Sequence, residues 1–189
     1  MIVIGGSLGG CDALREILGR LPASFPHPIA VALHRHRESE GMIVPVVQRG
    51  CALPVSEVED KEPIAAGHVY LCPSDYHLLI DKDCFALSTD DPVNFARPAI
   101  DVLFESAAEW KRSKAVGVVL TGSGSDGAKG ARCIQEYGGT VFVQDPKTAE
   151  GPWMPTAAIA STQTPLVLSL AEIAQALINL TSLRQRSAD

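Results

Sequence analysis

Three polar residues that could do chemistry together stand directly after short aliphatic runs. Ser7 follows IVIGG, His34 follows IAVAL, and Asp126 lies in the loop TGSGSDG that comes after VGVVL. A hydroxyl, an imidazole and a carboxylate are the groups needed for nucleophilic acyl transfer, because the imidazole removes the hydroxyl proton and the carboxylate fixes its tautomer. The pattern predicts a Ser-His-Asp triad, provided that the fold brings the three loops together.

Glycines surround Ser7 and match a turn that presents a nucleophile. The stretch 5–9 reads G-G-S-L-G and fits G-x-S-x-G, the tight strand-to-helix turn that holds a serine exposed. The backbone N–H of Leu8, or one from Gly122 or Ser123 in the second glycine loop, would then complete an oxyanion hole. These three residues are therefore expected to line the pocket.

A phosphate-binding loop is the alternative for the same glycines. The G-x-G-x-x-G pattern is not satisfied, because Ser7 and Leu8 interrupt it, and the P-loop pattern fails because Cys11 stands where lysine is required. A plain anion site at the start of the following helix stays open. By itself, the pattern leaves the nucleophile and the anion site about equally supported.

An arginine and a pair of histidines are candidates to contact a substrate or a metal ion. Arg97 could contact a substrate carboxylate or bridge to Asp101, and the sequence does not decide between these alternatives. His34 and His36 have an H-x-H spacing that metal sites use, but few partners are nearby to complete such a site. We therefore expect no metal ion and no organic cofactor.

The elements that must position these residues alternate between strands and helices. The short runs rich in valine and isoleucine are typical of strands buried on both faces: Ile2–Ile4, Ile29–Leu33, Val69–Leu71, Val116–Leu120 and Val141–Val143. Amphipathic stripes predict the helices between and after them: Cys11–Leu21, Ile100–Trp110, Gly127–Tyr137 and Leu170–Leu180. We expect an α/β fold, doubly wound, with a mainly parallel sheet and helices on both faces. The carboxyl ends of parallel strands share one edge, so the three loops would meet there.

The middle of the chain differs from this alternation. Residues 67–88 contain short strand-like runs with a turn signal at 81–83, which predicts a β-hairpin insertion. The sequence shows no internal repeat and no linker. We expect one domain over residues 1–180 and a frayed tail over residues 181–189.

Composition narrows the class of protein. The chain has 189 residues, 46% hydrophobic and 20% charged, with a formal net charge of −6. The negative charge argues against binding to nucleic acid or to anionic membranes, which need a basic surface. No apolar run is long enough for a signal peptide or a transmembrane helix. The five cysteines are scattered without a CxxC pair, so we expect reduced thiols and a cytoplasmic protein.

Five motifs in order resemble the chemotaxis protein-glutamate methylesterases: VIGGSLGG, LH at 33–34, RPAIDVLF, LTGSGSDGAKG and WMPTAAI. The resemblance runs from about Ile2 to Leu180. It implies a doubly wound α/β domain with a triad at Ser7, His34 and Asp126, which removes methyl groups from glutamate γ-methyl esters on the cytoplasmic helices of chemoreceptors. The family also deamidates certain receptor glutamines.

The chain departs from the family pattern at several positions. Leu8 replaces a threonine of the first glycine loop, and Ser123 stands where a methionine is usual. The stretch LHRHRES is more basic than its counterpart, so Arg35 and Arg37 could contact an acidic receptor surface or signal a different substrate. These changes bear on the identity of the substrate more than on the type of reaction.

Typical members of that family carry an N-terminal receiver domain, whereas here Met1 leads directly into the first strand. Either this is a stand-alone esterase, regulated in trans if at all, or it is an excised domain. Three other functions are alternatives to a receptor methylesterase. They are a hydrolase of another ester in a pathway unrelated to motility, a binding module of the same fold without turnover, and a nucleotide-binding protein.

Overall fold

The structure is a computed structural model that describes residues 1–35 and 42–185, with side chains as far as residue 180. His36 and Arg37, which the sequence analysis singled out, lie outside the described residues. Helix α6 continues to Gln185, past the expected domain boundary at residue 180. Residues 186–189, at the end of the expected tail, are not described.

A seven-stranded parallel sheet forms the centre of the molecule, in the order β3-β4-β2-β1-β7-β8-β9. The strands are β1 Ile2–Gly6, β2 Ile29–Leu33, β3 Val55–Glu57, β4 Val69–Leu71, β7 Val116–Val119, β8 Thr140–Gln144 and β9 Leu166–Leu168. The five predicted strands are all present. The strands β3 and β9, which form the two edges of the sheet, were not predicted.

The chain reverses its direction of winding between β1 and β7. From β1 it builds outward through β2, and it later returns to the other side of β1 with β7, followed by β8 and β9. Ligands of open α/β sheets bind at such a switch point, at the carboxyl ends of the strands. The loops after β1 and β7, where Ser7 and Asp126 lie, meet at this place.

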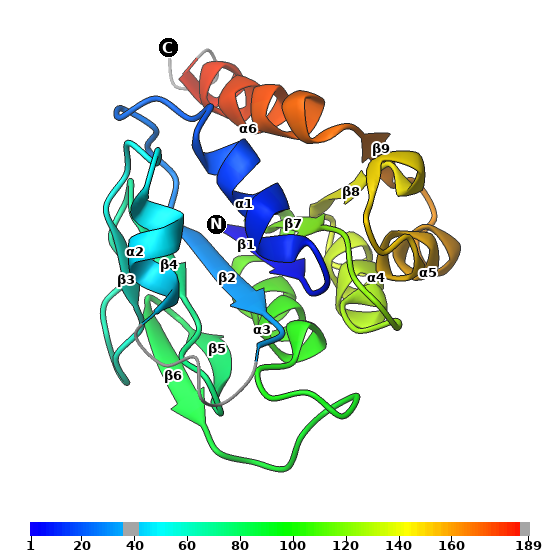
Figure 1. Ribbon diagram of the computed structural model, residues 1–189. Helices are drawn as coiled ribbons and strands as arrows, with labels where there is room; N and C mark the ends of the chain where they lie inside the picture. The colour runs from blue at the N-terminus through cyan, green and yellow to red at the C-terminus, as the bar shows by residue number, and fades with distance from the viewer. Residues whose placement is uncertain (36–41, 186–189) are drawn as a thin grey trace.

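Helices cover both faces of the sheet, as expected (Figure 1). They are α1 Gly10–Leu18, α2 Ile43–Gln48, α3 Ile100–Lys111, α4 Ala128–Glu136, α5 Trp153–Ser161 and α6 Leu170–Gln185, with 3₁₀ turns at Arg112–Lys114 and Pro146–Thr148. Apolar side chains of α1, α2 and α6 form one core, and those of α3, α4 and α5 form the other. Helices α2 and α5 were not predicted; α5 is apolar around its circumference, so it has no amphipathic stripe.

The predicted hairpin insertion is confirmed. Strands β5 (His77–Asp81) and β6 (Cys84–Ser88) pair antiparallel as a separate two-stranded sheet. Leu78 and Ile80 of β5 join the core around α3. The hairpin therefore braces the outer side of the helix that begins next to the site.

The start of helix α6 is capped by side-chain hydrogen bonds. Ser169 and Glu172 form a capping box at the start of α6: the Glu172 Oε2 accepts from the Ser169 N–H at 2.8 Å. The Glu172 N–H donates in return to the Ser169 hydroxyl at 3.4 Å. Among the described residues, no helix is both long and apolar enough to cross a membrane.

Candidate active site

The sheet register places Ser7 and His34 side by side. Gly6 of β1 lies opposite Leu33 of β2, and the next residue of each strand is Ser7 and His34. The His34 N–H donates to the Gly6 carbonyl at 3.0 Å, which continues the ladder to the edge of the sheet. The two residues therefore share one edge because their strands are parallel and in register.

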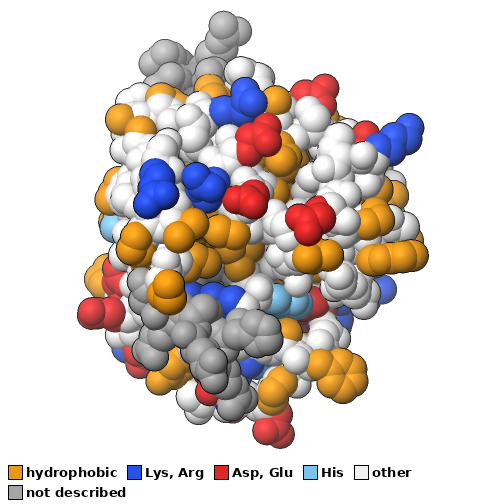
Figure 2. All heavy atoms as spheres, viewed as in Figure 1, with side chains coloured by type: hydrophobic (Ala, Val, Ile, Leu, Met, Phe, Trp, Pro, Cys, Tyr) orange, Lys and Arg blue, Asp and Glu red, His pale blue; other side chains and the backbone are white. Residues whose placement is uncertain are grey.

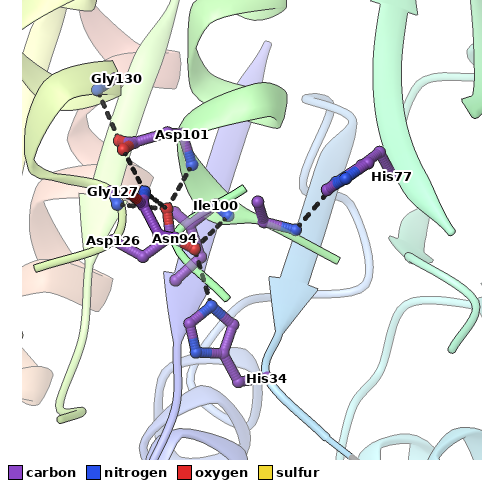
Figure 3. A network of polar contacts seen from close by, with 9 residues as sticks. His34, His77, Asn94, Ile100, Asp101, Asp126, Gly127 and Gly130 are labelled. Carbon is purple, nitrogen blue, oxygen red and sulfur yellow. Dashed lines mark hydrogen bonds and ion pairs between the residues drawn. The ribbon is translucent and has the colours of Figure 1, made fainter. Parts of the chain in front are cut away.

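His34 contacts Asp126, which lies 92 residues further along the chain. The His34 Nε2 and the Asp126 Oδ2 are 2.7 Å apart (Figure 3). His34 keeps part of its side chain open to solvent, whereas the Asp126 carboxylate is 3% exposed. A buried carboxylate beside a half-exposed imidazole can orient the ring and stabilise its protonated form.

Hydrogen bonds saturate the Asp126 carboxylate. Oδ2 accepts from His34 and from the Ile100 N–H at 2.7 Å. Oδ1 accepts from the N–H groups of Asp101 and Gly127 and from the Asn94 amide, each at 3.0 Å. The two N–H groups from the start of α3 point at the carboxylate because the first residues of a helix have no partners within it.

The pKa of Asp126 is set by burial and hydrogen bonding, which act in opposite directions. Burial raises the pKa of the carboxyl, but the hydrogen bonds from His34, the α3 backbone and Asn94 outweigh burial and hold the pKa below its ordinary value. The carboxylate is therefore ionised near neutral pH, which is the state that can stabilise a charged imidazole.

Asp101 and Asn94 belong to the same network, although the sequence analysis gave Asn94 no role. The Asn94 amide nitrogen also donates to Asp101 Oδ2 at 2.8 Å, and Asp101 Oδ1 accepts from the Gly130 N–H at 2.7 Å (Figure 3). Burial, followed by the nearby charge of Asp126, raises the pKa of Asp101, and the Gly130 and Asn94 hydrogen bonds oppose this rise. No spacing rule could have found Asn94, because it acts from a loop 32 residues before Asp126.

The turn at Ser7 is held by Thr121, a second residue that the sequence analysis missed. The Ser7 N–H donates to the Thr121 carbonyl at 3.0 Å, and the Thr121 hydroxyl donates to the Leu8 carbonyl at 2.9 Å. The Gly151 N–H in turn donates to the Thr121 hydroxyl at 2.8 Å. Gly9 adopts a φ of 73°, a conformation that favours glycine, and so lets the chain turn into α1.

Gly122 packs between Met154 and Ser7 and is not an oxyanion donor. A Cβ at this position would lie 2.1 Å from the Met154 Sδ and 2.8 Å from the Ser7 Cβ, so only glycine fits between them. The Gly122 N–H already donates to the Gly151 carbonyl at 2.8 Å, which corrects the expectation that it could serve the oxyanion. The N–H groups of Leu8 and Ser123 remain as candidates.

Both arginines with a predicted substrate role are engaged within the chain. Arg35, with 8% of its side chain exposed, donates to Glu57 and to the Cys72 carbonyl. Arg97 donates to Asp75 at 2.7 Å and also to two backbone carbonyls. The alternative bridge from Arg97 to Asp101 does not form. Substrate contact by either arginine stays a prediction, in which a substrate would compete with these partners.

The site thus brings a serine and a histidine–aspartate pair to the switch point of a parallel sheet, with Gly122 packed closely against the serine. Within residues 1–35 and 42–185, no group of three or more His, Cys, Asp or Glu side chains is placed to hold a metal ion. The fold and the site define an α/β protein of the class that binds ligands at the carboxyl edge of its strands.

Comparison with known proteins gives the family. The family model described as CheB methylesterase matches residues 2–177, and the chain belongs to this family. A putative protein-glutamate methylesterase/protein-glutamine glutaminase of Leptospira interrogans is 47% identical over 95% of this chain and 93% of its own length. The crystal structure of the Thermotoga maritima CheB methylesterase catalytic domain matches with a TM-score of 0.89 at 36% identity, covering 95% of this chain and 97% of that chain.

Other relatives are longer. The protein-glutamate methylesterase/protein-glutamine glutaminase of Maricaulis maris is 37% identical over 94% of this chain, which spans 45% of that protein. The chain therefore spans nearly all of the Leptospira relative but about half of the Maricaulis relative. These matches confirm the predicted class of enzyme, a carboxylic ester hydrolase of the methylesterase type, and the predicted fold.

Proposed function

We propose that this protein hydrolyses glutamate γ-methyl esters of chemoreceptors with Ser7 as nucleophile, His34 as general base and Asp126 as the orienting carboxylate. The observation that carries the proposal is the 2.7 Å contact between His34 and Asp126 at the sheet edge where Ser7 also lies. The names of the relatives support the substrate.

The steps follow from the geometry of the histidine. The Asp126 carboxylate accepts a hydrogen bond from the N–H of His34 Nε2. The unprotonated Nδ1 is therefore the nitrogen that acts as base. As the Ser7 oxygen attacks the ester carbonyl, Nδ1 takes its proton, and the Asp126 carboxylate stabilises the imidazolium. Nδ1 then gives this proton to the departing methoxide, and methanol leaves an acyl-enzyme. A water molecule then gives a proton to the same nitrogen as it attacks the acyl-enzyme. The proton passes from Nδ1 to the departing Ser7 oxygen, and the glutamate side chain of the receptor leaves as a carboxylate.

Charge that develops on the carbonyl oxygen needs donors beside Ser7. The N–H of Leu8 directly follows Ser7, and that of Ser123 lies in the loop after β7. Among the described residues, neither N–H has a hydrogen-bond partner. We assign them to the oxyanion, since a preorganised donor of this kind is worth about 10²–10³ in kcat. The leucine side chain at position 8 does not interfere with this role, because the backbone supplies the donor.

The same acyl chemistry extends to glutamine. When Ser7 attacks an amide carbonyl, the departing nitrogen accepts the His34 proton in place of methoxide and leaves as ammonia, and the acyl-enzyme is identical. The term glutaminase in the names of the relatives supports this second activity. Deamidation therefore requires no further catalytic group.

Apolar side chains around the site favour a macromolecular substrate. Leu8, Phe95 and Trp153 are 49%, 105% and 67% exposed, and each adjoins a residue of the site. On the face seen in Figure 2, hydrophobic side chains lie on several sides of the histidine near the middle of the view. Exposed apolar groups gathered around a site are typical of protein interaction surfaces.

We place the reaction on the cytoplasmic helices of methylated receptors and the protein in the cytoplasm. Regulation by a receiver domain in trans is part of the proposal, and it predicts activity in the purified chain that a phosphodonor does not change. No contact with nucleic acid and no insertion into the membrane are part of the proposal.

The test is methanol release from methylated receptor membranes of the same organism, comparing the wild type with Ser7→Ala. Release that disappears in the variant supports the nucleophile and the substrate together. A wild type that labels at Ser7 with a fluorophosphonate but releases no methanol favours a hydrolase of another ester. A wild type that does neither favours a binding module and contradicts the proposal.

A further inference from the structure

We propose that Asn94 is a positioning residue for the catalytic pair, which holds the Asp126 carboxylate in place by donating to it and to Asp101 at once. This inference rests on the proposed function, in which Asp126 orients His34. Asn94 would act through Asp126 and would not contact the reacting atoms.

The geometry identifies the amide as a donor. Asn94 Nδ2 lies 3.0 Å from Asp126 Oδ1 and 2.8 Å from Asp101 Oδ2 (Figure 3). An amide nitrogen has two hydrogens, and each of them meets one carboxylate oxygen. The opposite orientation would turn the amide oxygen toward the ionised Asp126 carboxylate, which has no proton to offer.

Two carboxylates close together need such a donor. Asp101 and Asp126 are 5% and 3% exposed, and each disfavours the ionised form of the other. The groups that face Asn94 are Asp126 from the loop before α4 and Asp101 from α3, with His34, which follows β2, on the far side of Asp126. Glu105, one turn further along α3, adds to the negative charge around Asp101. Asn94 is the neutral side chain that donates to both members of the pair.

The backbone around Asn94 is built to deliver this amide. Val93 and Ala96 exchange two backbone hydrogen bonds, and Asn94 and Phe95 between them have φ values of 53° and 62°. This is the pattern of a type I′ turn, in which asparagine is favoured at the first central position. Phenylalanine is not favoured at the second, and its side chain is fully exposed.

Two side chains, those of His77 and Arg97, anchor the loop that carries the turn. His77, which is 2% exposed, accepts the Ala99 N–H on Nδ1 and donates from Nε2 to the Asp91 carbonyl, each at 3.2 Å. Arg97 donates to the carbonyls of Thr89 and Asp90 at 2.6 and 2.9 Å. The turn is therefore fixed on both sides, and the amide of Asn94 reaches the carboxylates from a rigid loop.

Turn formation alone could explain an asparagine here, so the experiment must separate the turn from the donor. Asn94→Asp keeps the shape and tolerates the positive φ, but at neutral pH it replaces the donor with a third carboxylate. Asn94→Gly keeps the turn and removes the side chain altogether. Asn179→Asp makes the same chemical change on the exposed face of α6 and is the matched control.

The measurement is the second-order rate of fluorophosphonate labelling of Ser7 in the full chain between pH 5 and pH 8, normalised to the folded fraction. We expect Asn94→Gly to label about tenfold more slowly than the wild type, the loss expected for one hydrogen bond to a charged group. Asn94→Asp should be slower still at pH 8. It should recover relative to Asn94→Gly toward pH 5, where the introduced carboxyl is protonated and can donate. Asn179→Asp should label like the wild type.

Asn94→Asp that labels like the wild type at pH 8, or a ratio between the two variants that does not change with pH, would overturn the inference and leave only a turn residue. A wild type that labels but releases no methanol from receptors would refute the proposed substrate while the labelling rates still decide the role of Asn94. A wild type that does not label at all overturns both.

Discussion

Replacing Asp126 by asparagine tests the proposed site most directly, because the consequences can be worked out atom by atom. The Asp126 Oδ1 accepts three hydrogen bonds and Oδ2 accepts two. An amide has one accepting oxygen, and it will take the side with three donors. The amide nitrogen then faces His34 Nε2 and the Ile100 N–H, where the wild type has an acceptor.

The new amide donates to His34 Nε2, so the ring must carry its proton on Nδ1. That is the wrong tautomer for a base, and we expect Asp126→Asn to lower kcat by about 10⁴-fold. The Ile100 N–H loses its acceptor, and an unpaired buried donor costs about 1–3 kcal/mol of the free energy of unfolding. The variant should therefore fold with reduced stability and lose almost all activity.

The assay is steady-state methanol release together with urea unfolding of the same preparations. Asp83→Asn is the matched control, since Asp83 has a 99% exposed side chain and pairs only at the surface with Lys111. The control should match the wild type in both measurements. A folded Asp126→Asn protein that keeps more than about a tenth of the wild-type kcat would refute the role assigned to Asp126.

Three further predictions follow from single contacts. Gly122→Ala introduces a Cβ that overlaps Met154 and displaces the nucleophile turn, so kcat should fall by about 10²-fold; equal methanol release by the variant would show that the turn tolerates the methyl group. The pKa of Asp126 is lower in the folded protein than in the unfolded chain, so its contribution to stability is present at neutral pH and is lost as the pH falls through the folded pKa. Urea unfolding from pH 7 to pH 3 should show a shallower decline for Asp126→Asn than for the wild type, and parallel curves would contradict this. Ser169→Ala removes the capping box with Glu172 and should cost about 1 kcal/mol in urea unfolding without altering activity; an unchanged unfolding midpoint would show that the cap contributes nothing.

Several parts of the fold could be read from the sequence because their causes are local. The runs at 2–4, 29–33 and 116–120 are apolar without alternation, and a strand buried on both faces demands this. The capping box at Ser169 and the glycine turn around Ser7 depend on residues within a few positions of each other. The hairpin at residues 77–88 was predicted from its turn for the same reason.

The elements that were missed lack a local signal. Helix α5 has apolar residues on its exposed side as well as on its buried side, so no amphipathic stripe marks it. Strand β9 is a strand because it pairs with β8 at the edge of the sheet. The structure of these two elements depends on how they pack against and pair with the rest of the chain. Sequence periodicity cannot report such a cause.

The sequence by itself determined the chemical groups of the candidate site and the kind of sheet that carries them, since a serine, a histidine and an aspartate each follow an aliphatic strand. Only the tertiary structure decided how these groups are used. In the folded protein His34 contacts Asp126, and Arg97 pairs with Asp75 instead of Asp101. The Gly122 N–H donates to the Gly151 carbonyl. Such pairings depend on strand order and on a few tenths of an ångström between residues far apart in the chain, and no local pattern encodes either.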